Sequence, residues 1–256
     1  NPNLGWEYSK TQNYGVDFGI LNNRLTGSVE YYKTHTFDLL TQKSLPATSG
    51  WSSIVSNVAE TENKGLEVSL NGVIFDNPDG FTWEAGINFY TNYYNFYGNA
   101  NYRILNPTKR FNTFRINYNM YTEFNKESGK LQDNSVNANL NLTTVKNNYY
   151  GGGITFYPLE IYDYYEPRAE NRYVTIPRKI ETWGSISTNY NHKFAIDLNG
   201  TFNVLDESER ITYGFDIGPR YRFSDKFLLT YFFSYFRRNN NKGYIDQIDD
   251  DDNSNT

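Results

Sequence analysis

The residues from Phe194 to Tyr235 form three successive stretches in which apolar and polar side chains alternate, with only short breaks between them. The stretches are Phe194–Val204, Ile211–Phe223 and Phe227–Tyr235. A period of two is typical of a strand whose two faces meet different surroundings. Because the breaks are too short for crossover connections, this part of the sequence predicts consecutive antiparallel hairpins.

The predicted strands are long. Each has roughly 9 to 13 residues, whereas strands of soluble sheets usually have about five or six. A tilted strand that crosses a bilayer needs roughly 9 to 11 residues. One face is aromatic and aliphatic and the other carries Asp, Arg, Asn and Gly, as in a barrel wall between lipid and a polar lumen. A large soluble antiparallel sheet, packed face to face on a second sheet, is the alternative.

The composition fits the membrane interpretation. Tyr and Phe number 24 and 18, and aromatic residues make up 18% of the chain, although only 38% of its 256 residues are hydrophobic. Aromatic rings with polar edges suit the girdles of membrane barrels. The mean hydropathy is -0.72, and no apolar run approaches the roughly 18 residues of a membrane helix. We therefore expect any membrane crossing to be made by strands.

Several functional classes are disfavoured. The net charge of -5 gives no electrostatic basis for binding nucleic acid, and the absence of cysteine excludes disulfides and thiolate chemistry. Neither His35 nor His192 has partners at the spacing of a metal or nucleophile site. Asp249–Asp252 lacks the glycine and glutamate of a calcium loop. We expect no catalytic residue, no metal, no cofactor and no enzymatic activity.

A glycine run and the chain start give two further expectations. Gly151–Gly153 lacks the lysine of a phosphate loop and lies within a strand pattern, so we expect a close backbone approach or a bulge there. No charged start followed by an apolar core appears at Asn1, so no secretion signal is present. Since an outer-membrane protein needs such a signal, we expect the chain to be a fragment.

Read in order, the chain predicts an all-β, antiparallel up-and-down meander of about 12 strands that forms a transmembrane β-barrel. A tight turn is expected at Leu21–Arg24. Two stretches without alternation, Asp38–Glu60 and Leu159–Thr182, predict long loops. The apolar phase changes after Phe89, which predicts a turn, a bulge or a junction between unlike sequences within Thr91–Asn95.

Four ordered motifs in the first part of the chain carry a family resemblance. They are Asn1–Glu7 (NPNLGWE), Asp17–Gly19 followed by Asn23–Gly27 (DFG and NRLTG), Leu45–Gly50 (LPATSG) and Glu62–Glu67 (ENKGLE). Residues 1–91 resemble the late barrel strands of SusC-like TonB-dependent glycan transporters. The resemblance implies import of oligosaccharides or peptides through the outer membrane, with a plug domain, a surface lipoprotein and TonB as partners in a full-length parent.

A second set of motifs resembles an uncharacterised outer-membrane barrel domain that follows sugar-binding modules. The motifs are Tyr162–Arg168 (YDYYEPR), Arg172–Tyr173 (RY), Lys193–Leu198 (KFAIDL), Pro219–Lys226 (PRYRFSDK) and Gly243–Tyr244 (GY). This resemblance covers about residues 93–247. We therefore expect strands of one family at 1–91, strands of another at 92–247 that continue the same sheet, and a disordered acidic tail at 248–256. The junction suggests a chimera, a recombination product or an assembled sequence.

The polar positions of the strands predict a charged lumen. The expected lumen-facing residues are Asp17, Glu30, Glu67, Glu84, Arg115, Asp197, Asp216, Arg220 and Arg222. They would form a lattice of ion pairs between strands. Alternatively, Arg220 and Arg222 could hold a carboxylate or a phosphate with paired hydrogen bonds.

Aromatic residues in the two predicted loops are the candidates for ligand contact. They are Trp51 in the first loop and Tyr162, Tyr164, Tyr165 and Tyr173 in the second, with Arg168 beside them. Aromatic faces on loops suit stacking against sugars. Packing of these rings on one another or at a lipid interface is the alternative.

The combined expectation is an outer-membrane β-barrel of a Gram-negative bacterium that contacts lipid and takes part in TonB-dependent uptake of glycans or similar nutrients. A non-transporting barrel that anchors a surface carbohydrate-binding module is the alternative. In either case, a glycan or a peptide is the expected ligand, and nucleic acid is not.

Overall fold

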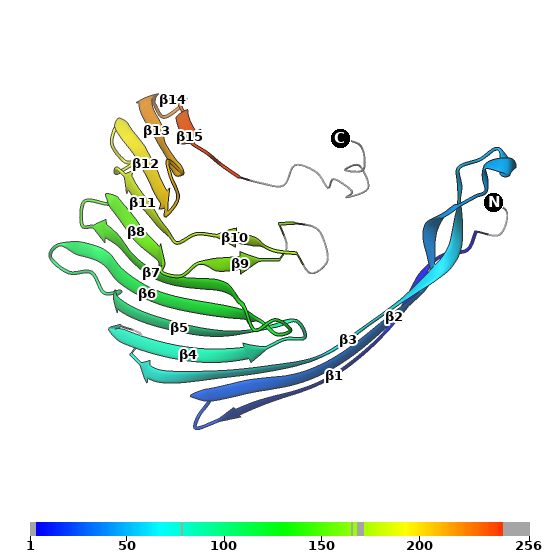
Figure 1. Ribbon diagram of the computed structural model, residues 1–256. Coiled ribbons are helices and arrows are strands. Elements are labelled where there is room, and N and C mark those ends of the chain that lie inside the picture. Colours follow the sequence, from blue (N-terminus) through cyan, green and yellow to red (C-terminus); the bar gives the residue numbers. More distant parts are fainter. Residues whose placement is uncertain (1–3, 78, 165, 168–171, 243–256) are drawn as a thin grey trace. The chain divides into compact units, whose positions relative to one another are not determined.

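The protein is built from β-strands, as seen in a computed structural model that describes residues 4–77, 79–164, 166–167 and 172–242 (Figure 1). The strands are β1 (Tyr8–Ile20), β2 (Leu25–Ser44), β3 (Ser53–Asp76), β4 (Phe81–Phe89), β5 (Tyr93–Ile104), β6 (Phe111–Asn125), β7 (Leu131–Thr144), β8 (Tyr149–Tyr157), β9 (Ile161–Asp163), β10 (Val174–Ile176), β11 (Lys179–Ser187), β12 (Phe194–Leu205), β13 (Ile211–Ser224), β14 (Phe227–Thr230) and β15 (Phe233–Arg238). Within the described ranges, the single helical element is a 3-10 turn, η1 (Ala47–Ser49). None of the described residues form a helix long and apolar enough to cross a membrane.

Thirteen of the strands form one sheet, whose hydrogen-bonding order is β1-β2-β3-β4-β5-β6-β7-β8-β11-β12-β13-β14, with β15 paired to β13. β9 and β10 form a separate pair. In the part of the chain that the structure describes, the order has two ends, β1 and β14, and does not close. The predicted all-β antiparallel meander is confirmed. Closure into a transmembrane barrel stays a prediction.

The chain divides into two compact units, which we describe separately. Unit 1 comprises Asn1–Gly72 and Gly86–Tyr94, and unit 2 comprises Val73–Ala85 and Asn95–Thr256. β3, β4 and β5 therefore contribute residues to both units.

In unit 1, β1 and β2 form a regular hairpin around the predicted turn at Leu21–Arg24, which is confirmed. Leu21, Asn22 and Asn23 all have positive φ angles, between 54° and 61°. Asparagine tolerates this left-handed region better than most residues, so the two adjacent Asn residues explain why the chain reverses here. A second turn, at Thr91 and Asn92 between β4 and β5, accounts for the change of apolar phase after Phe89.

The prediction of a long loop over Asp38–Glu60 is wrong. β2 and β3 stay paired as far as Ser44 and Ser53, so only residues 45–52 connect them. The register shifts on both sides of Leu39, and Asp38 has a φ of 55°. A bulge changes the face on which the following side chains lie. The alternation is therefore broken in the sequence although the two strands continue.

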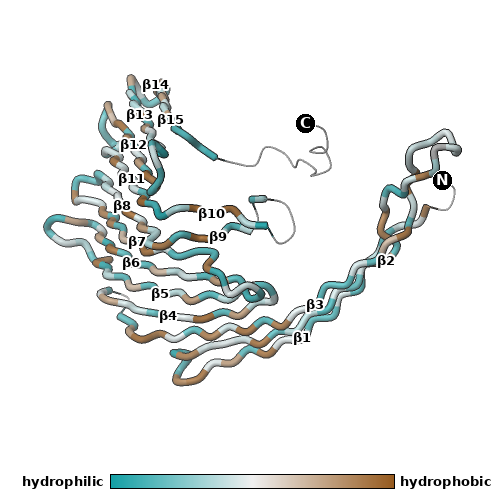
Figure 2. Tube along the Cα trace, viewed as in Figure 1, coloured by the Kyte–Doolittle hydropathy of each residue, from teal (hydrophilic) through white to brown (hydrophobic). Residues whose placement is uncertain are grey.

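In unit 2, register partners place the apolar positions of neighbouring strands on one face. Ile116 of β6 lies opposite Leu140 of β7, and Leu198 of β12 lies opposite Ile217 of β13. Figure 2 shows hydrophobic positions recurring along these strands. The predicted strands over Phe194–Val204 and Ile211–Phe223 are confirmed as β12 and β13. Their apolar sides form a common surface because antiparallel partners project to the same side of a sheet.

The prediction of a second long loop, over Leu159–Thr182, is also wrong. The segment contains β9 and β10, which pair from Val174↔Asp163 to Ile176↔Ile161, and the start of β11. Figure 1 shows the β9–β10 hairpin projecting from the sheet. β11 was not predicted because Thr182 and Gly184 interrupt the apolar alternation that identifies the other strands.

The last predicted strand, Phe227–Tyr235, is split into β14 and β15. Both halves keep the same register on β13, with Arg220↔Thr230 and Ile217↔Phe233 as partners. The interruption coincides with Pro219, which accepts a bond from Tyr231 N–H at 3.0 Å. Proline has no N–H to donate in return. One missing hydrogen bond thus divides an otherwise continuous strand.

The sheet of the described residues has almost no buried core. Its one fully buried hydrophobic side chain is Ala195, which is 1% exposed. Large apolar side chains on the face opposite the polar positions are exposed; in unit 2 they include Ile116, Leu140, Ile154, Phe156, Ile180, Phe202 and Phe215. Within unit 2, the apolar face of the sheet is therefore uncovered.

Candidate functional site

The polar face of unit 2 carries a ladder of amide side chains. We define this face by the register row Asn117, Asn139, Gly153, Trp183 and Thr201, which crosses β6, β7, β8, β11 and β12. Asn117 Nδ2 donates to Asn139 Oδ1 at 2.6 Å, and Asn119 Nδ2 donates to Asn137 Oδ1 at 3.0 Å. Within β7, Asn139 bonds to Asn137 and Asn141 bonds to Asn139.

The predicted ion-pair lattice is wrong for the described residues. The ion pairs there join other residues, such as Lys33 with Glu62 at 2.9 Å and Lys179 with Glu181 at 2.7 Å. Glu30 lies directly opposite Glu67, so these two side chains cannot attract each other. Uncharged amides and hydroxyls therefore provide most of the hydrogen bonds between polar side chains across β6 to β8.

Other members of the predicted polar set form separate contacts. Asp197 accepts hydrogen bonds from Ser187 Oγ and Tyr190 Oη, both at 2.5 Å. The guanidinium of Arg220 lies 4.2 Å from the centre of the Tyr190 ring. Glu84 accepts a bond from Asn99 Nδ2 at 3.3 Å.

Three of the predicted ligand-contacting tyrosines gather around a lysine. The Nζ atom of Lys130, in the turn before β7, lies 4.5 Å from the Tyr162 ring centre and 3.7 Å from that of Tyr173. Tyr173 also contacts Tyr164, at 5.5 Å between ring centres. A hydrogen bond with Tyr173 is the main reason that the pKa of Lys130 is raised. The structure thus brings these rings together, with a cation against two of them.

The remaining predicted ligand contacts are not part of this cluster. Trp51 lies in the loop of residues 45–52 in unit 1, and its side chain is 75% exposed. Its backbone is held by Ser49, whose Oγ donates to Trp51 O at 2.9 Å. Tyr165 and Arg168 lie outside the residues that the structure describes, as does Asp249–Asp252.

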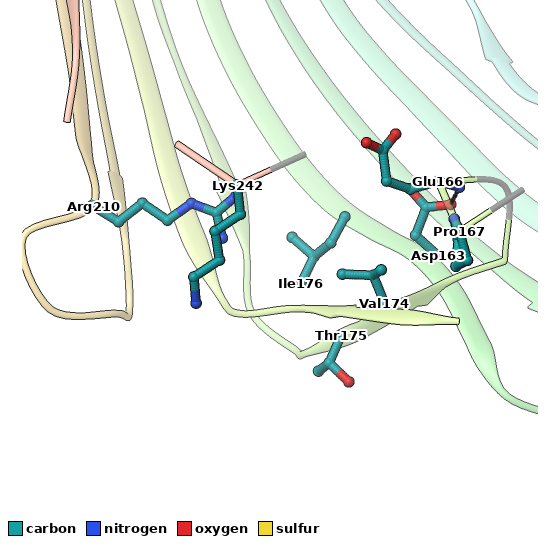
Figure 3. A pocket seen from close by; sticks show the side chains of 8 residues that line it. All are labelled: Asp163, Glu166, Pro167, Val174, Thr175, Ile176, Arg210 and Lys242. Carbon is teal, nitrogen blue, oxygen red and sulfur yellow. Dashed lines mark hydrogen bonds between the residues drawn. The ribbon is translucent and has the colours of Figure 1, made fainter. Parts of the chain in front are cut away.

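A cavity of about 420 Å³ lies on the other side of the β9–β10 hairpin (Figure 3). Val174 and Ile176 form its apolar floor, between Asp163 and Glu166 on one side and Arg210 and Lys242 on the other (Figure 3). Arg210 and Lys242 both form ion pairs with Glu207. Because these cations are paired within the protein, we do not assign an anion site to the cavity.

Trp183 is a residue of the polar face that the sequence did not single out. A Cβ atom placed on Gly153 would lie 2.6 Å from its Nε1, and a Cβ on Gly151 would lie 3.1 Å from its ring. The indole therefore lies over the glycine run of β8. The predicted close approach is made by a side chain and not by backbone, and the pairing of β8 with β7 and β11 has no bulge. The glycine run was the only signal in the sequence, and it did not identify the partner.

Comparison with protein families identifies the chain. A family model described as Domain of unknown function (DUF5916) matches residues 48–255, which is most of the sequence. The chain belongs to the DUF5916 family. The match begins at residue 48, so it includes part of the segment that resembles SusC-like transporters as well as the whole amide ladder of this DUF5916 sheet.

Curated relatives match a shorter part of the DUF5916 chain. TonB-dependent receptor P3 of Formosa agariphila is 46% identical over 92 residues, which is 36% of this chain and 9% of the relative. TonB-dependent receptor SusC of Bacteroides thetaiotaomicron is 37% identical over 94 residues, again 36% of this chain and 9% of the relative. The chain thus spans less than a tenth of the length of these receptors. No solved structure matches it.

Proposed function

We propose that this chain forms part of the wall of an outer-membrane β-barrel in a Gram-negative bacterium, and that the barrel takes up glycans or similar nutrients in a TonB-dependent manner. The partial identity to receptors named as TonB-dependent supports the proposal. Lipid would cover the apolar face, and TonB, a surface lipoprotein and a glycan or peptide ligand would be the partners of the complete receptor.

The observation that carries the proposal is the uncovered apolar face of unit 2. A soluble protein rarely exposes a contiguous apolar patch of more than a few hundred Å². Here Phe202 and Phe215 are 49% and 43% exposed, and Ala195 alone is a buried apolar residue in the described ranges. Burial of this face in hydrocarbon would supply the favourable transfer free energy that a soluble domain obtains from its core.

Strand length supports the same conclusion. β12 and β13 have 12 and 14 residues, enough for a tilted strand to cross a bilayer. In a single-layer wall, the amide ladder would face the lumen and the aromatic face would meet lipid. The alternative function, a barrel that only anchors a carbohydrate-binding module, uses the same wall.

The membrane part of the proposal is tested with two single-tryptophan variants of the full chain in bilayers. Trp83 stacks against Phe75 on the apolar side of β4, whereas Trp183 lies on the polar face. Brominated acyl chains quench only the fluorophores that contact them. We expect quenching of Trp83 and little quenching of Trp183. Equal quenching of both residues, or stable purification of the chain as a monomer without detergent, would contradict the proposal.

The transport part is tested by deleting the encoding gene in the source bacterium and measuring growth on single oligosaccharides. Loss of growth on one class of oligosaccharide is the expected result. Unchanged growth together with loss of surface binding would favour the anchor function instead.

A further inference from the structure

We propose that Trp183 is the stacking platform of a binding site for an uncharged sugar ring, placed in the middle of the polar face. The inference rests on the proposed function for the setting of this face, a lumen that nutrients cross. It adds the position, the residues and the chemical class of a site on that face.

The platform depends on the absence of side chains beneath the indole. In the register of β8 and β11, Trp183 lies opposite Gly153, and Gly151 lies opposite Ser185. Any Cβ on Gly153 would collide with Nε1 of the indole, as the distance of 2.6 Å shows. The two glycines thus allow the ring to lie along the sheet, and Trp183 is still 37% exposed. The pyrrole part of the indole thus lies over Gly153 and the benzene part lies over Gly151.

The glycine run is unfavourable in a strand. A glycine in a strand interior is less favourable than alanine, because its backbone loses more conformational freedom on folding. On the polar face, the room left by Gly151 and Gly153 is filled by Trp183 and by Tyr149, whose hydroxyl oxygen lies 2.4 Å from a Cβ built on Gly151. This arrangement places the indole over the two glycines and leaves more than a third of Trp183 exposed to a ligand.

Uncharged hydrogen-bonding groups flank the platform on the β7 and β12 sides. Glu181, one polar-face position along β11, has its carboxylate paired with Lys179 at 2.7 Å. On the β7 side, Asn139 lies next to Gly153, and Tyr149 Oη donates to Asn141 Oδ1 at 2.6 Å. On the β12 side, Ser185 Oγ donates to Asn199 Oδ1 at 2.7 Å. An amide group has both donors and acceptors, so it can bond the hydroxyls of a sugar whichever way they point.

A hollow next to the platform extends the site. It has a volume of about 360 Å³ and is lined in part by Ser185, Asn199, Asp197 and Arg220. Ser185 and Asn199 lie one polar-face position along β11 and β12 from the row of Trp183. A chain of at least two sugar rings could therefore place one ring on the indole and the next in the hollow.

The chemistry of these groups selects the ligand class. A pyranose ring has an apolar face of C–H groups that stacks on an aromatic ring, and a rim of hydroxyls that bond to amides. The hollow has one carboxylate and one guanidinium, and Asp197 already accepts two hydrogen bonds within the protein. Neither a strongly anionic nor a cationic ligand is favoured, so we infer a neutral oligosaccharide.

The first experiment measures binding of neutral hexasaccharides to the full chain in detergent by titration calorimetry. Malto-, cello-, xylo- and laminari-hexaose are the probes. We expect at least one to bind, and we expect Trp183→Ala to weaken that binding at least tenfold, with Trp183→Phe intermediate. Trp83→Phe, on the apolar side of β4, is the matched control and should bind like the wild type. Binding by Trp183→Ala with unchanged affinity, or no binding of any probe to the wild type, would overturn the proposal.

A second measurement leaves the site intact and so does not depend on whether the alanine variant folds. In a variant in which Trp183 is the only tryptophan, the bound sugar should protect its emission from acrylamide by at least twofold. Unchanged quenching with sugar bound would exclude Trp183 from the site. The brominated-lipid experiment tests the membrane proposal separately, because it reports Trp83 and needs no sugar.

Discussion

At the residue scale, the polar face of unit 2 is held by amide pairs. Asn117 and Asn139 lie opposite each other and bond at 2.6 Å, and both are half-buried. Amide–amide bonds keep their strength when salt or pH changes, because neither partner is charged. The observed amide ladder should therefore be insensitive to salt and pH, whereas the ion pairs that the sequence predicted would be sensitive to both.

The first prediction concerns that pair. Replacing Asn117 or Asn139 singly with Ala leaves one amide without its cross-strand partner, and replacing both removes the interaction. We expect a coupling free energy of about 0.5–1.5 kcal/mol from the double-mutant cycle, measured by urea unfolding in detergent at two salt concentrations. A coupling that falls steeply with salt would contradict the assignment of an uncharged bond.

A second prediction at this scale concerns pH. Glu207, in the turn between β12 and β13, accepts hydrogen bonds from Lys242 and, at 3.0 Å, from Arg210. These bonds, that of Lys242 first, lower the pKa of Glu207 below 4.5. Because the pKa of Glu207 is lower in the folded state than in the unfolded state, its charge stabilises the fold at pH values above the unfolded-state pKa. This stabilisation is lost as the pH falls through the folded-state pKa.

Glu207→Gln should therefore flatten the decline of the unfolding midpoint below pH 4.5, the ordinary value for glutamate. The substitution should also lower the unfolding midpoint at neutral pH, because it removes the ion pairs of Glu207 with Lys242 and Arg210. Thermal unfolding between about pH 3 and 7 measures both effects. Glu209→Gln, in the same turn, is the control, and an identical pH profile for wild type and Glu207→Gln would sink the idea.

At the element scale, the strands that the sequence predicted are those with unlike faces and regular register. β12 and β13 satisfy both conditions from Val204↔Ile211 to Phe194↔Tyr221. β11 has no large apolar side chain at Thr182 or Gly184, two successive positions of its apolar face. The distal part of β2 is shifted by the bulge at Leu39. Such a segment is held as a strand by hydrogen bonds to its neighbours, and its own sequence lacks the apolar–polar alternation by which a strand is predicted.

The candidate sites were less predictable than the strands for the same reason. The contact of Trp183 with Gly153 depends on the register of β8 and β11, and neither residue indicates the other in the sequence. The contact of Lys130 with Tyr173 depends on where the β9–β10 hairpin folds. Aromatic residues in a predicted loop could be identified as a group, but their cation partner could not.

The third prediction concerns the split between β14 and β15. Pro219→Val restores an N–H opposite Tyr231, where the structure has one bond of a reciprocal pair. We expect β14 and β15 to merge, amide exchange to slow over residues 230–234, and the free energy of unfolding to rise by about 1 kcal/mol. Hydrogen-exchange mass spectrometry checks this. Unchanged exchange there would show that another feature interrupts the strand.

At the scale of the whole molecule, stability depends on the medium that covers the apolar face. Ile154 of β8 is 46% exposed on that face, and Thr155, the next residue, accepts a bond from Asn137 on the polar face. Because Ile154 and Thr155 are adjacent in β8 but lie on opposite faces, substituting each in turn tests which face of the sheet meets lipid.

The fourth prediction is that Ile154→Arg destabilises the chain in bilayers by about 2–4 kcal/mol, because a charge then faces hydrocarbon. Thr155→Arg should lose no more than about 0.5–1.5 kcal/mol, the value of one hydrogen bond. Urea unfolding in lipid vesicles measures both variants. Equal effects would mean that the two faces meet the same medium.

The strand order has a mechanical consequence. From β11 to β13 in unit 2, each strand is hydrogen-bonded to its neighbours in the sheet order, and no other strand of the described ranges forms a second layer on it. A pulling force applied at the β15 side would therefore load one strand pair at a time instead of the whole sheet. Single-molecule extraction should give a series of separate ruptures, the strands leaving in reverse order of sequence, because no shared core requires them to yield together.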